Sequence, residues 1–304
     1  MFLFKLGPGW FGGLGHGIFE RFVSFQGRDT MVILSIAARA RLVFVCLSLA
    51  VISSARGAGW ETTLPPFTPG TFPEARPLRV RYNFGWGGYS AAKADIRLEK
   101  LPNGQHRFEA SGGTMGLART LWSYDLRHSA VSDAGTLRPI RVSEVENIRS
   151  KRVTTELKFS PEGVVSEREE RKGEEVKSKT RRFDFPNVLS LNSALLFLRT
   201  QSMADGAVHR AVVYPATSAY LCTVTVLGRE RISVPTGTYE AFKLDVQLDK
   251  IGKDRDLLPH KKFRKATVWL SNDTDRLLLR IEAQIFIGKV FAEIRSVEFG
   301  ETKP

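Results

Sequence analysis

The sequence has little cysteine and little histidine, and both shortages restrict the chemistry that it can support. Two of its 304 residues are cysteine and five are histidine. Cys46 lies inside an apolar N-terminal run, so the chain beyond that run has one thiol, Cys222, and no intramolecular disulfide. We interpret Cys222 as a small hydrophobic residue on a strand. Four histidines beyond the run lack the short spacing of zinc ligands: His106, His128, His209 and His260.

Catalytic signatures are missing as well. The sequence contains no G-x-S-x-G turn, no Walker-type phosphate loop and no Cys-x-x-Cys pair. The glycine-rich segment 85–88 lies between alternating runs and indicates a bend or bulge. Glu144 and Glu146 share one face of an expected strand, and we interpret them as solvent-facing, because exposed strand faces commonly carry such pairs. The sequence therefore predicts no catalytic residue, no metal site and no cofactor.

No apolar run is long enough to span a bilayer comfortably, since a spanning helix needs roughly 20 apolar residues. Residues 42–54 are apolar, follow Arg39 and Arg41, and end in small residues. This layout is typical of a secretory signal peptide, which we place at residues 31–57. Residues 1–30 resemble an upstream extension of the reading frame, with Met31 as the expected start. The sequence thus predicts export to the periplasm or cell envelope.

The signal peptide leaves two questions open. Small residues at the recognition positions fit cleavage before Ala58 or before Arg56. The alternative is an uncleaved N-terminal anchor, in which Met31 and the residues after it lengthen the apolar helix. The bulky Val45 before Cys46 argues against a lipidated cysteine.

Basic residues outnumber acidic ones, and the excess is smaller once the leader is removed. The formal net charge is +13, but residues 1–57 hold six basic and two acidic side chains, which leaves 39 Lys or Arg and 30 Asp or Glu. The remaining charge of +9 favours anionic partners. Export argues against nucleic acid. The candidate contact with an anionic membrane surface is Lys261, Lys262, Arg264 and Lys265, for which a solvated loop is the alternative.

Beyond the leader, the pattern changes from a linker to strands. Residues 58–77 are rich in proline and poor in apolar residues, as expected of a linker. From Leu78 onward apolar and polar residues alternate with a period of two, and turn signals separate the alternating runs. We therefore expect a single β-rich domain at residues 78–300, built as an antiparallel meander. One helix near residues 190–201 is expected, capped by Ser190, with an apolar stripe of Leu191, Ala194, Leu195 and Leu198 against the sheet.

Several large apolar side chains are candidates for lining a ligand cavity, because aromatic residues dominate apolar pockets. The alternative is that they fill the core of a fully packed domain. The candidates are Trp86, Trp122, Tyr124, Leu195 and Trp269.

Short motifs recur in an order that resembles one bacterial family. They are Tyr82-Asn-Phe-Gly-Trp86, Leu121-Trp-Ser-Tyr124, Leu137-Arg-Pro139, Leu189 to Arg199, Val234-Pro-Thr-Gly237 with Thr-Tyr-Glu-Ala241, and Val268-Trp-Leu-Ser271. Over roughly residues 76–300 the chain resembles the uncharacterised family called domain of unknown function 3108. The resemblance implies an exported protein with a fold related to the periplasmic lipoprotein carriers of the Lol system. That fold is a curved antiparallel sheet around an apolar cavity, partly closed by a helix. Lipidated members of the carrier group begin with an acylated cysteine, which this sequence lacks.

Pattern and resemblance together predict a mainly β fold: a large curved antiparallel sheet, half-barrel or barrel-like, with one packed helix. The leading hypothesis for function is a carrier or binding protein for a lipid or another apolar molecule. The alternative is an envelope assembly or structural protein without a small-molecule ligand, and a hydrolase of envelope polymers is the least favoured hypothesis. The ligand, the partner and the oligomeric state stay open.

Overall fold

The computed structural model describes residues 59–71, 73–260, 263–285 and 288–300. The chain divides into two compact units, Phe11–Leu64 and Met1–Trp10 with Pro65–Pro304. In the first unit the described part is a short 3₁₀ helix, η1 (Trp60–Thr63). The predicted signal peptide and the upstream extension lie outside the described residues. All that follows concerns the second unit.

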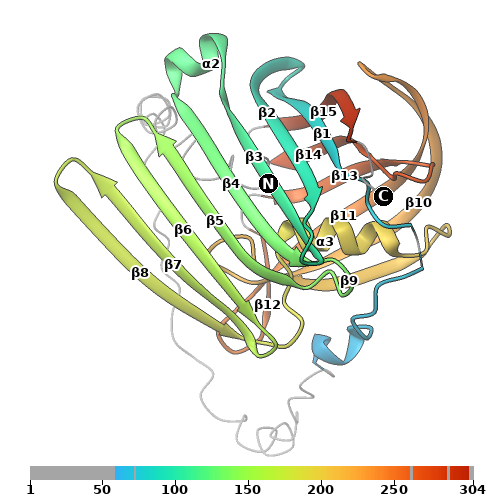
Figure 1. Cartoon of the computed structure of the whole chain (residues 1–304), viewed down its shortest axis with the longest axis horizontal. Helices are drawn as coiled ribbons and strands as arrows, with labels where there is room; N and C mark the ends of the chain where they lie inside the picture. The colour runs from blue at the N-terminus through green and yellow to red at the C-terminus, as the bar shows by residue number, and fades with distance from the viewer. Residues whose placement is uncertain (1–58, 72, 261–262, 286–287, 301–304) are drawn as a thin grey trace, which may run out of the picture. The chain divides into compact units, whose positions relative to one another are not determined.

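Strands dominate this unit (Figure 1). They are β1 (Leu78–Trp86), β2 (Tyr89–Lys100), β3 (Gln105–Thr114), β4 (Tyr124–Asp133), β5 (Pro139–Ile148), β6 (Lys151–Ser160), β7 (Gly163–Lys172), β8 (Glu175–Asp184), β9 (Val208–Val213), β10 (Tyr220–Val234), β11 (Gly237–Ile251), β12 (Leu257–Pro259), β13 (Phe263–Ser271), β14 (Leu278–Ile285) and β15 (Gly288–Phe299). In the described residues they form one sheet in the order β8-β7-β6-β5-β4-β3-β2-β1-β15-β14-β13-β11-β10-β9, with β12 beside β11. The predicted antiparallel sheet is confirmed.

Alternation along each strand decides which side chains face inward. On β1, Val80, Tyr82 and Phe84 are buried, whereas Arg79 and Arg81 point outward and pair with one carboxylate of β2. The inner face thus collects the apolar residues and the outer face stays polar, as in sheets with one solvated side. Burial of the inner face supplies most of the driving force for this fold.

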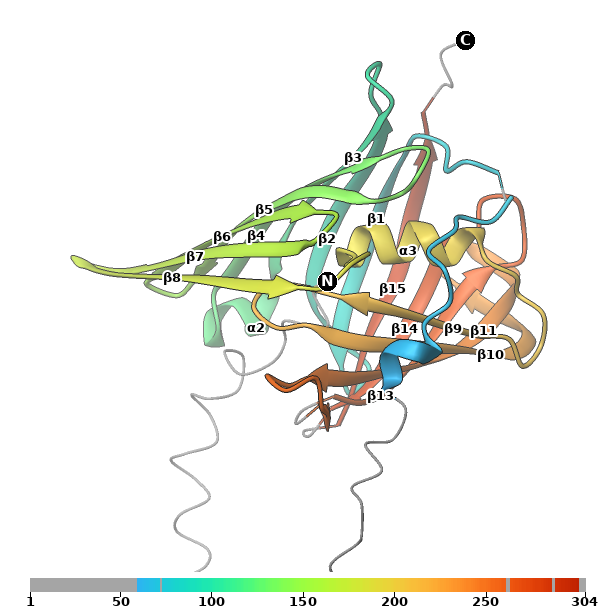
Figure 2. The same cartoon turned by 90° about the horizontal axis from the view of Figure 1, so that it is seen from below.

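The sheet curves strongly but does not close (Figure 2). β8 and β9 end the strand order and are not paired with each other in the described part of the chain. Side chains bridge one end of the gap, where the rings of Phe183 and Tyr214 lie 6.1 Å apart and the Ser166 hydroxyl donates to the Ala216 carbonyl at 2.6 Å. The architecture is therefore a half-barrel, as expected.

The glycine-rich segment 85–88 is a bulge followed by a tight turn. The register of β1 and β2 shifts between Phe84 and Gly85, and a Cβ on Gly85 would lie 2.2 Å from the Tyr89 carbonyl oxygen. Gly87 and Gly88 both have positive φ, 55° and 88°, which a two-residue hairpin turn of the primed type requires. The expected bend or bulge is confirmed.

The predicted helix is α3 (Leu191–Thr200), and it lies on the concave side of the sheet (Figure 2). The Ser190 hydroxyl accepts a hydrogen bond from the Ser193 amide at 3.1 Å, so the expected cap is present. The predicted stripe of leucine and alanine is partly buried and packs against the core, while Leu196 and Phe197 are buried more deeply. The helix therefore packs against its surroundings on more than the one face that the predicted stripe forms.

A second helix, α2 (Gly116–Leu121), was not expected. It is short, none of its residues is buried, and one apolar i, i+4 pair, Leu117 and Leu121, is too little for a periodic pattern that predicts a helix. Within the described part of the chain, neither helix has the length and hydrophobicity needed to traverse a lipid bilayer.

The linker was expected at residues 58–77, and described residues of its second part pack against α3. Phe67 stacks on Phe197 with ring centroids 4.6 Å apart, and the Gly70 amide donates to the Thr200 hydroxyl at 3.0 Å. One aromatic stack and hydrogen bonds between the backbone of this segment and side chains at the end of α3 hold the segment against the helix.

Removing the cap of α3 is expected to destabilise the unit. The Ser190→Ala variant loses the acceptor for the Ser193 amide, which costs about 1 kcal/mol. Urea unfolding followed by circular dichroism measures the change. Ser190→Thr keeps the accepting oxygen and should unfold close to the parent midpoint. An alanine variant as stable as the parent would show that the cap contributes nothing.

Candidate functional site

An apolar cavity of about 170 Å³ lies between α3 and the concave face of the sheet. Its walls come from alternate residues of β1, β2 and β3, so the period-two pattern of these strands builds them directly. α3 forms the opposite wall through Leu191, Leu195 and Leu196. The side chains from the strands are Leu78, Val80, Tyr82, Phe84, Ala94, Ile96, Leu98, Phe108 and Ala110. Such walls suit a hydrocarbon group.

Polar groups mark the end of the cavity near the start of α3. Asn192, which lines the cavity, places its Oδ1 2.9 Å from Nε2 of His128 on β4. The other ring nitrogen, Nδ1, lies 3.3 Å from Oε2 of Glu144 on β5. Both ring nitrogens thus face oxygen acceptors, which suits a doubly protonated ring beside a carboxylate, or a neutral ring with the Asn192 amide turned. This chain of contacts ties the first turn of α3 to the sheet.

Glu144 and Glu146 are buried, with 2% and 5% of their surfaces exposed, so the expectation that they face solvent was wrong. They lie on the inner face of β5 and have partners there: Glu146 accepts a hydrogen bond from the Tyr124 hydroxyl at 2.8 Å and lies 3.9 Å from Arg168. Burial, with the nearby carboxylate, raises the pKa of the Tyr124 hydroxyl. An alternating pattern shows that two residues share a face but not whether that face is the inner one, and here two glutamates lie on the inner face beside apolar residues such as Val142.

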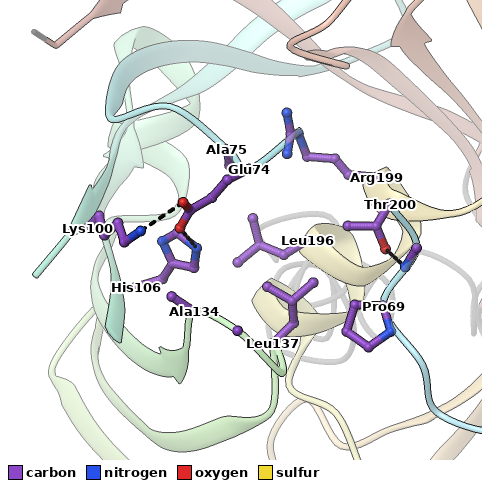
Figure 3. Close-up of a pocket in the computed structure, with 12 residues that line it drawn as sticks. Pro69, Glu74, Ala75, Lys100, His106, Ala134, Leu137, Leu196, Arg199 and Thr200 are labelled. Atoms are coloured by element: carbon purple, nitrogen blue, oxygen red, sulfur yellow. Dashed lines mark hydrogen bonds and ion pairs between the residues drawn. The ribbon is translucent and has the colours of Figure 1, made fainter. Parts of the chain in front are cut away.

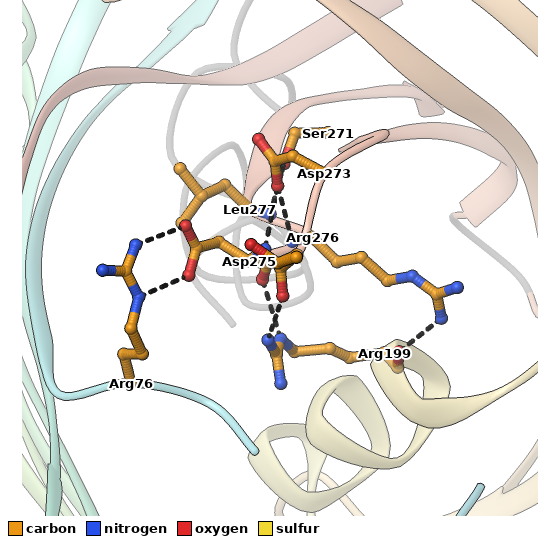
Figure 4. Close-up of polar contacts among 8 residues, drawn as sticks. Arg76, Arg199, Ser271, Asp273, Asp275, Arg276 and Leu277 are labelled. Atoms are coloured by element: carbon orange, nitrogen blue, oxygen red, sulfur yellow. Dashed lines mark hydrogen bonds and ion pairs between the residues drawn. The ribbon is translucent and has the colours of Figure 1, made fainter. Parts of the chain in front are cut away.

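The other end of α3 is fixed by arginines (Figure 4). Arg199 is 7% exposed and donates to the backbone carbonyls of Asp275, Thr274 and Pro73 at 2.8, 3.3 and 3.2 Å. Arg276 donates to the Arg199 carbonyl at 2.5 Å. The helix is therefore anchored at both ends by polar contacts, and the apolar cavity lies between them.

Asp275 joins this anchor to the segment before β1 (Figure 4). Its carboxylate accepts two hydrogen bonds from Arg76, at 2.8 and 2.6 Å, a bidentate arrangement that fixes both groups. The hydrogen bonds and the adjacent negative charges raise the pKa of Arg76, so the pair stays ionised. Arg76, Arg199 and Asp275 all line the apolar cavity and form its polar end.

A second, more polar cavity of about 270 Å³ shares Ala75, Leu196 and Arg199 with the first (Figure 3). His106 is 1% exposed and places Nε2 3.3 Å from Oε1 of Glu74, whose other oxygen pairs with Lys100 at 2.8 Å. Burial lowers the pKa of His106, and Glu74 counteracts this only in part. The ring is therefore held neutral inside the fold.

The five candidate cavity residues are spread over the unit. Leu195 lines the apolar cavity, and Tyr124 is buried beside Glu146. Trp86 ends β1 with 47% of its surface exposed, Trp122 follows α2 under the guanidinium of Arg149, and the Trp269 indole donates to Glu230 at 2.5 Å.

The candidate basic cluster is described in part. Lys261 and Lys262 lie outside the described residues, and Arg264 belongs to β13 with its side chain outside them. Lys265 is exposed and pairs with Asp245 at 3.0 Å. Cys222 is partly buried on β10 and packs against the core, and burial raises the pKa of its thiol to about 12. A thiol held protonated in this way is a poor nucleophile.

Sequence reasoning missed two groups that shape the site. The contact of His128 with Asn192 joins residues 64 positions apart, so no local pattern in the sequence predicts it. The arginine anchor joins the ends of two distant segments through backbone carbonyls, whose positions depend on the turn between β13 and β14. The alternation on β1 indicated which side chains share a face, but the cavity candidate on this strand, Trp86, is not among the residues that line the cavity.

Comparison with known proteins supports the fold. The family profile described as "Protein of unknown function (DUF3108)" matches residues 80–295. A crystal structure of a β-barrel-like protein of the domain of unknown function DUF1849, from Brucella abortus, is similar with a TM-score of 0.54 and 10% identity, over 76% of this chain and all of that one. A candidate exported protein with a YmcC-like fold from Bacteroides fragilis has a TM-score of 0.32 and 8% identity, over 76% of this chain and all of that one. None of the curated proteins compared with the chain matches it.

The buried neutral His106 is expected to make stability depend on pH. The unfolded chain takes up a proton on this ring near its ordinary pKa of about 6.5, whereas the folded chain resists because its pKa is lower. The free energy of unfolding should therefore fall as the pH drops below about 6.5 and recover above it. Urea titrations at a series of pH values measure this. His106→Phe should flatten the dependence, and a parallel His209→Gln variant should not. An unchanged slope in His106→Phe would contradict the assignment.

Proposed function

We propose that this chain, which belongs to the family described as "Protein of unknown function (DUF3108)", is an exported envelope protein that binds a lipid acyl chain or a similar apolar molecule. The observation that carries the proposal is the apolar cavity between α3 and the sheet. A fully packed interior would leave no such space, because protein cores are close-packed.

The lining of the cavity supports an amphiphilic ligand. Each methylene group transferred from water to such walls contributes about 0.8 kcal/mol to binding. A cavity of about 170 Å³ holds part of an acyl chain rather than a whole lipid. Asn192 stands at one end and the arginines at the other, so a polar head group can be met by hydrogen bonds or by positive charge. Binding of this kind needs no bond-making residue.

The anchored helix supports a role in retaining the ligand. α3 forms one wall, and its ends are held by Asn192 and Arg199, so the wall can be displaced only by breaking polar contacts. We propose that these polar contacts hold α3 over the cavity, so that water stays excluded once a hydrocarbon chain occupies it.

Narrowing the cavity should weaken ligand binding. Ala94 lines the cavity with 5% of its surface exposed, and Ala94→Leu projects a larger side chain into the space. We expect the affinity for a fluorescent fatty-acid probe to fall about tenfold or more, at a stability cost of about 1–3 kcal/mol. Displacement of the probe by unlabelled fatty acid measures the affinity.

Ala91→Leu is the matched control, because Ala91 lies on the same strand and is not among the residues that line the cavity. It should bind the probe like the parent. Native mass spectrometry of the purified protein should also reveal a co-purifying apolar molecule. If the parent neither binds the probe nor carries bound mass, the carrier proposal fails and the assembly alternative gains.

Export is tested separately. Fractionation of cells that express the chain from Met31 should place it in the periplasm, and N-terminal sequencing should begin at Ala58 or Arg56. Retention of residues 31–57 on a membrane-bound form would favour the uncleaved anchor, and a cytoplasmic product would contradict export.

A further inference from the structure

Large apolar side chains are exposed at one end of the sheet, on turns that are far apart in the sequence. Tyr89 is 82% exposed at the start of β2, and Trp86 is 47% exposed at the end of β1. On α2, Leu117 and Leu121 are 83% and 61% exposed and lie one helical turn apart. We call these four residues the apolar rim. Soluble proteins rarely gather such side chains without a partner.

Hydrogen bonds show that these turns adjoin one another. The Met115 amide, just before α2, donates to the Ala91 carbonyl of β2 at 2.9 Å. The Gly87 amide donates to the Lys289 carbonyl of β15 at 3.3 Å. On the other side, the Arg149 guanidinium donates to the Leu121 carbonyl at 3.0 Å. The rim is therefore one surface assembled from separate connections.

Basic groups flank this surface. Arg149 and Lys289 are exposed, and the Arg149 guanidinium lies 4.3 Å from the centroid of the Trp122 ring. Arg119 on α2 is paired with Asp125 at 2.8 Å, so the negative charge of Asp125 and the positive charge of Arg119 offset each other. Lys265 on β13 lies toward the same end of the sheet, and its charge is offset by Asp245 at 3.0 Å. The basic character beside the rim therefore comes from Arg149 and Lys289.

The chemistry of the rim matches a membrane surface. Tryptophan and tyrosine settle at the boundary between head groups and acyl chains, because each combines an apolar ring with a polar atom. Leucines on a short exposed helix add apolar contact, and adjacent arginine and lysine are drawn to anionic head groups. A set of side chains projecting from separate turns at one end fits a broad, flat partner better than a groove-filling peptide does.

From these observations we propose that the apolar rim is a docking surface for anionic phospholipid bilayers. The inference rests on the proposed function, since a carrier of acyl chains has to exchange its ligand with a membrane. Strand β1 links the two features: Phe84 lines the cavity, and two residues later Trp86 belongs to the rim. Docking brings one end of the cavity wall to the lipid.

Sedimentation with vesicles tests the proposal. The purified protein is mixed with vesicles of phosphatidylglycerol and phosphatidylcholine in equal parts, or of phosphatidylcholine alone. We expect binding to the anionic vesicles, and a loss of affinity of about tenfold or more in the triple variant Tyr89→Ser, Leu117→Ser, Leu121→Ser. Lys289→Gln should weaken binding about fivefold, and added salt should reduce the difference.

The matched control is Val208→Ser with Leu227→Ser. These residues are 52% and 51% exposed on β9 and β10, away from the rim, and their replacement should leave vesicle binding unchanged. The rim residues make few contacts, so the triple variant is expected to fold, which circular dichroism and its unfolding midpoint verify.

Three outcomes overturn the proposal. The protein does not sediment with anionic vesicles, or the triple variant binds them as tightly as the parent, or the control loses as much affinity as the rim variant. If the rim residues do not affect vesicle binding but are required for crosslinking to an envelope protein, the surface binds a protein partner instead. The fatty-acid probe is measured in every variant: intact probe binding without vesicle binding removes the rim proposal alone, and vesicle binding without probe binding removes the carrier proposal alone.

Discussion

The packing of α3 against the concave face of the sheet is the interaction on which the rest of the structure depends. A curved sheet that does not close exposes an apolar inner face, and water contact with that face would cost more free energy than the fold can spare. α3 covers the face over β1, β2 and β3 but does not fill the space beneath it, so a cavity remains. The same geometry gives both the stability of the unit and its candidate site.

Covering an open sheet with one helix creates a second requirement, which is to fix the helix in place. Apolar contacts are not directional, so they allow the helix to slide. Hydrogen bonds at the two ends supply direction: Asn192 with His128 at the start, and Arg199 with the turn between β13 and β14 at the end. His128 and Arg199 are buried, and a buried polar group is tolerated when it is hydrogen-bonded. The same hydrogen bonds therefore hold the helix in position and place polar groups at the two ends of the cavity.

The ends of the strands serve a different purpose from their middles. In the middle, alternation sends every second side chain inward, and the inner face is shielded. At the end that carries α2 and the turn between β1 and β2, the side chains lie beyond the shielded inner face of the sheet. Tyr89 and Leu117 therefore remain exposed. If an acyl chain occupies the cavity, its route to a membrane is short on this side, because β1 belongs to both the cavity wall and the rim.

The sequence by itself determined the strands, their antiparallel order and the helix with its Ser190 cap, because these depend on local alternation, turn residues and capping. It also separated the two faces of β1 by their alternation, but it did not show that one of them lines a cavity, and the candidate on this strand, Trp86, is exposed at its end. It did not determine that Glu144 and Glu146 face inward, since a period of two defines a face but not its direction. Nor did it place the arginine anchor or gather Trp86 with Leu121. Those facts depend on which distant segments meet, and only the tertiary structure decided that, because the curvature of the sheet sets which strand ends lie together.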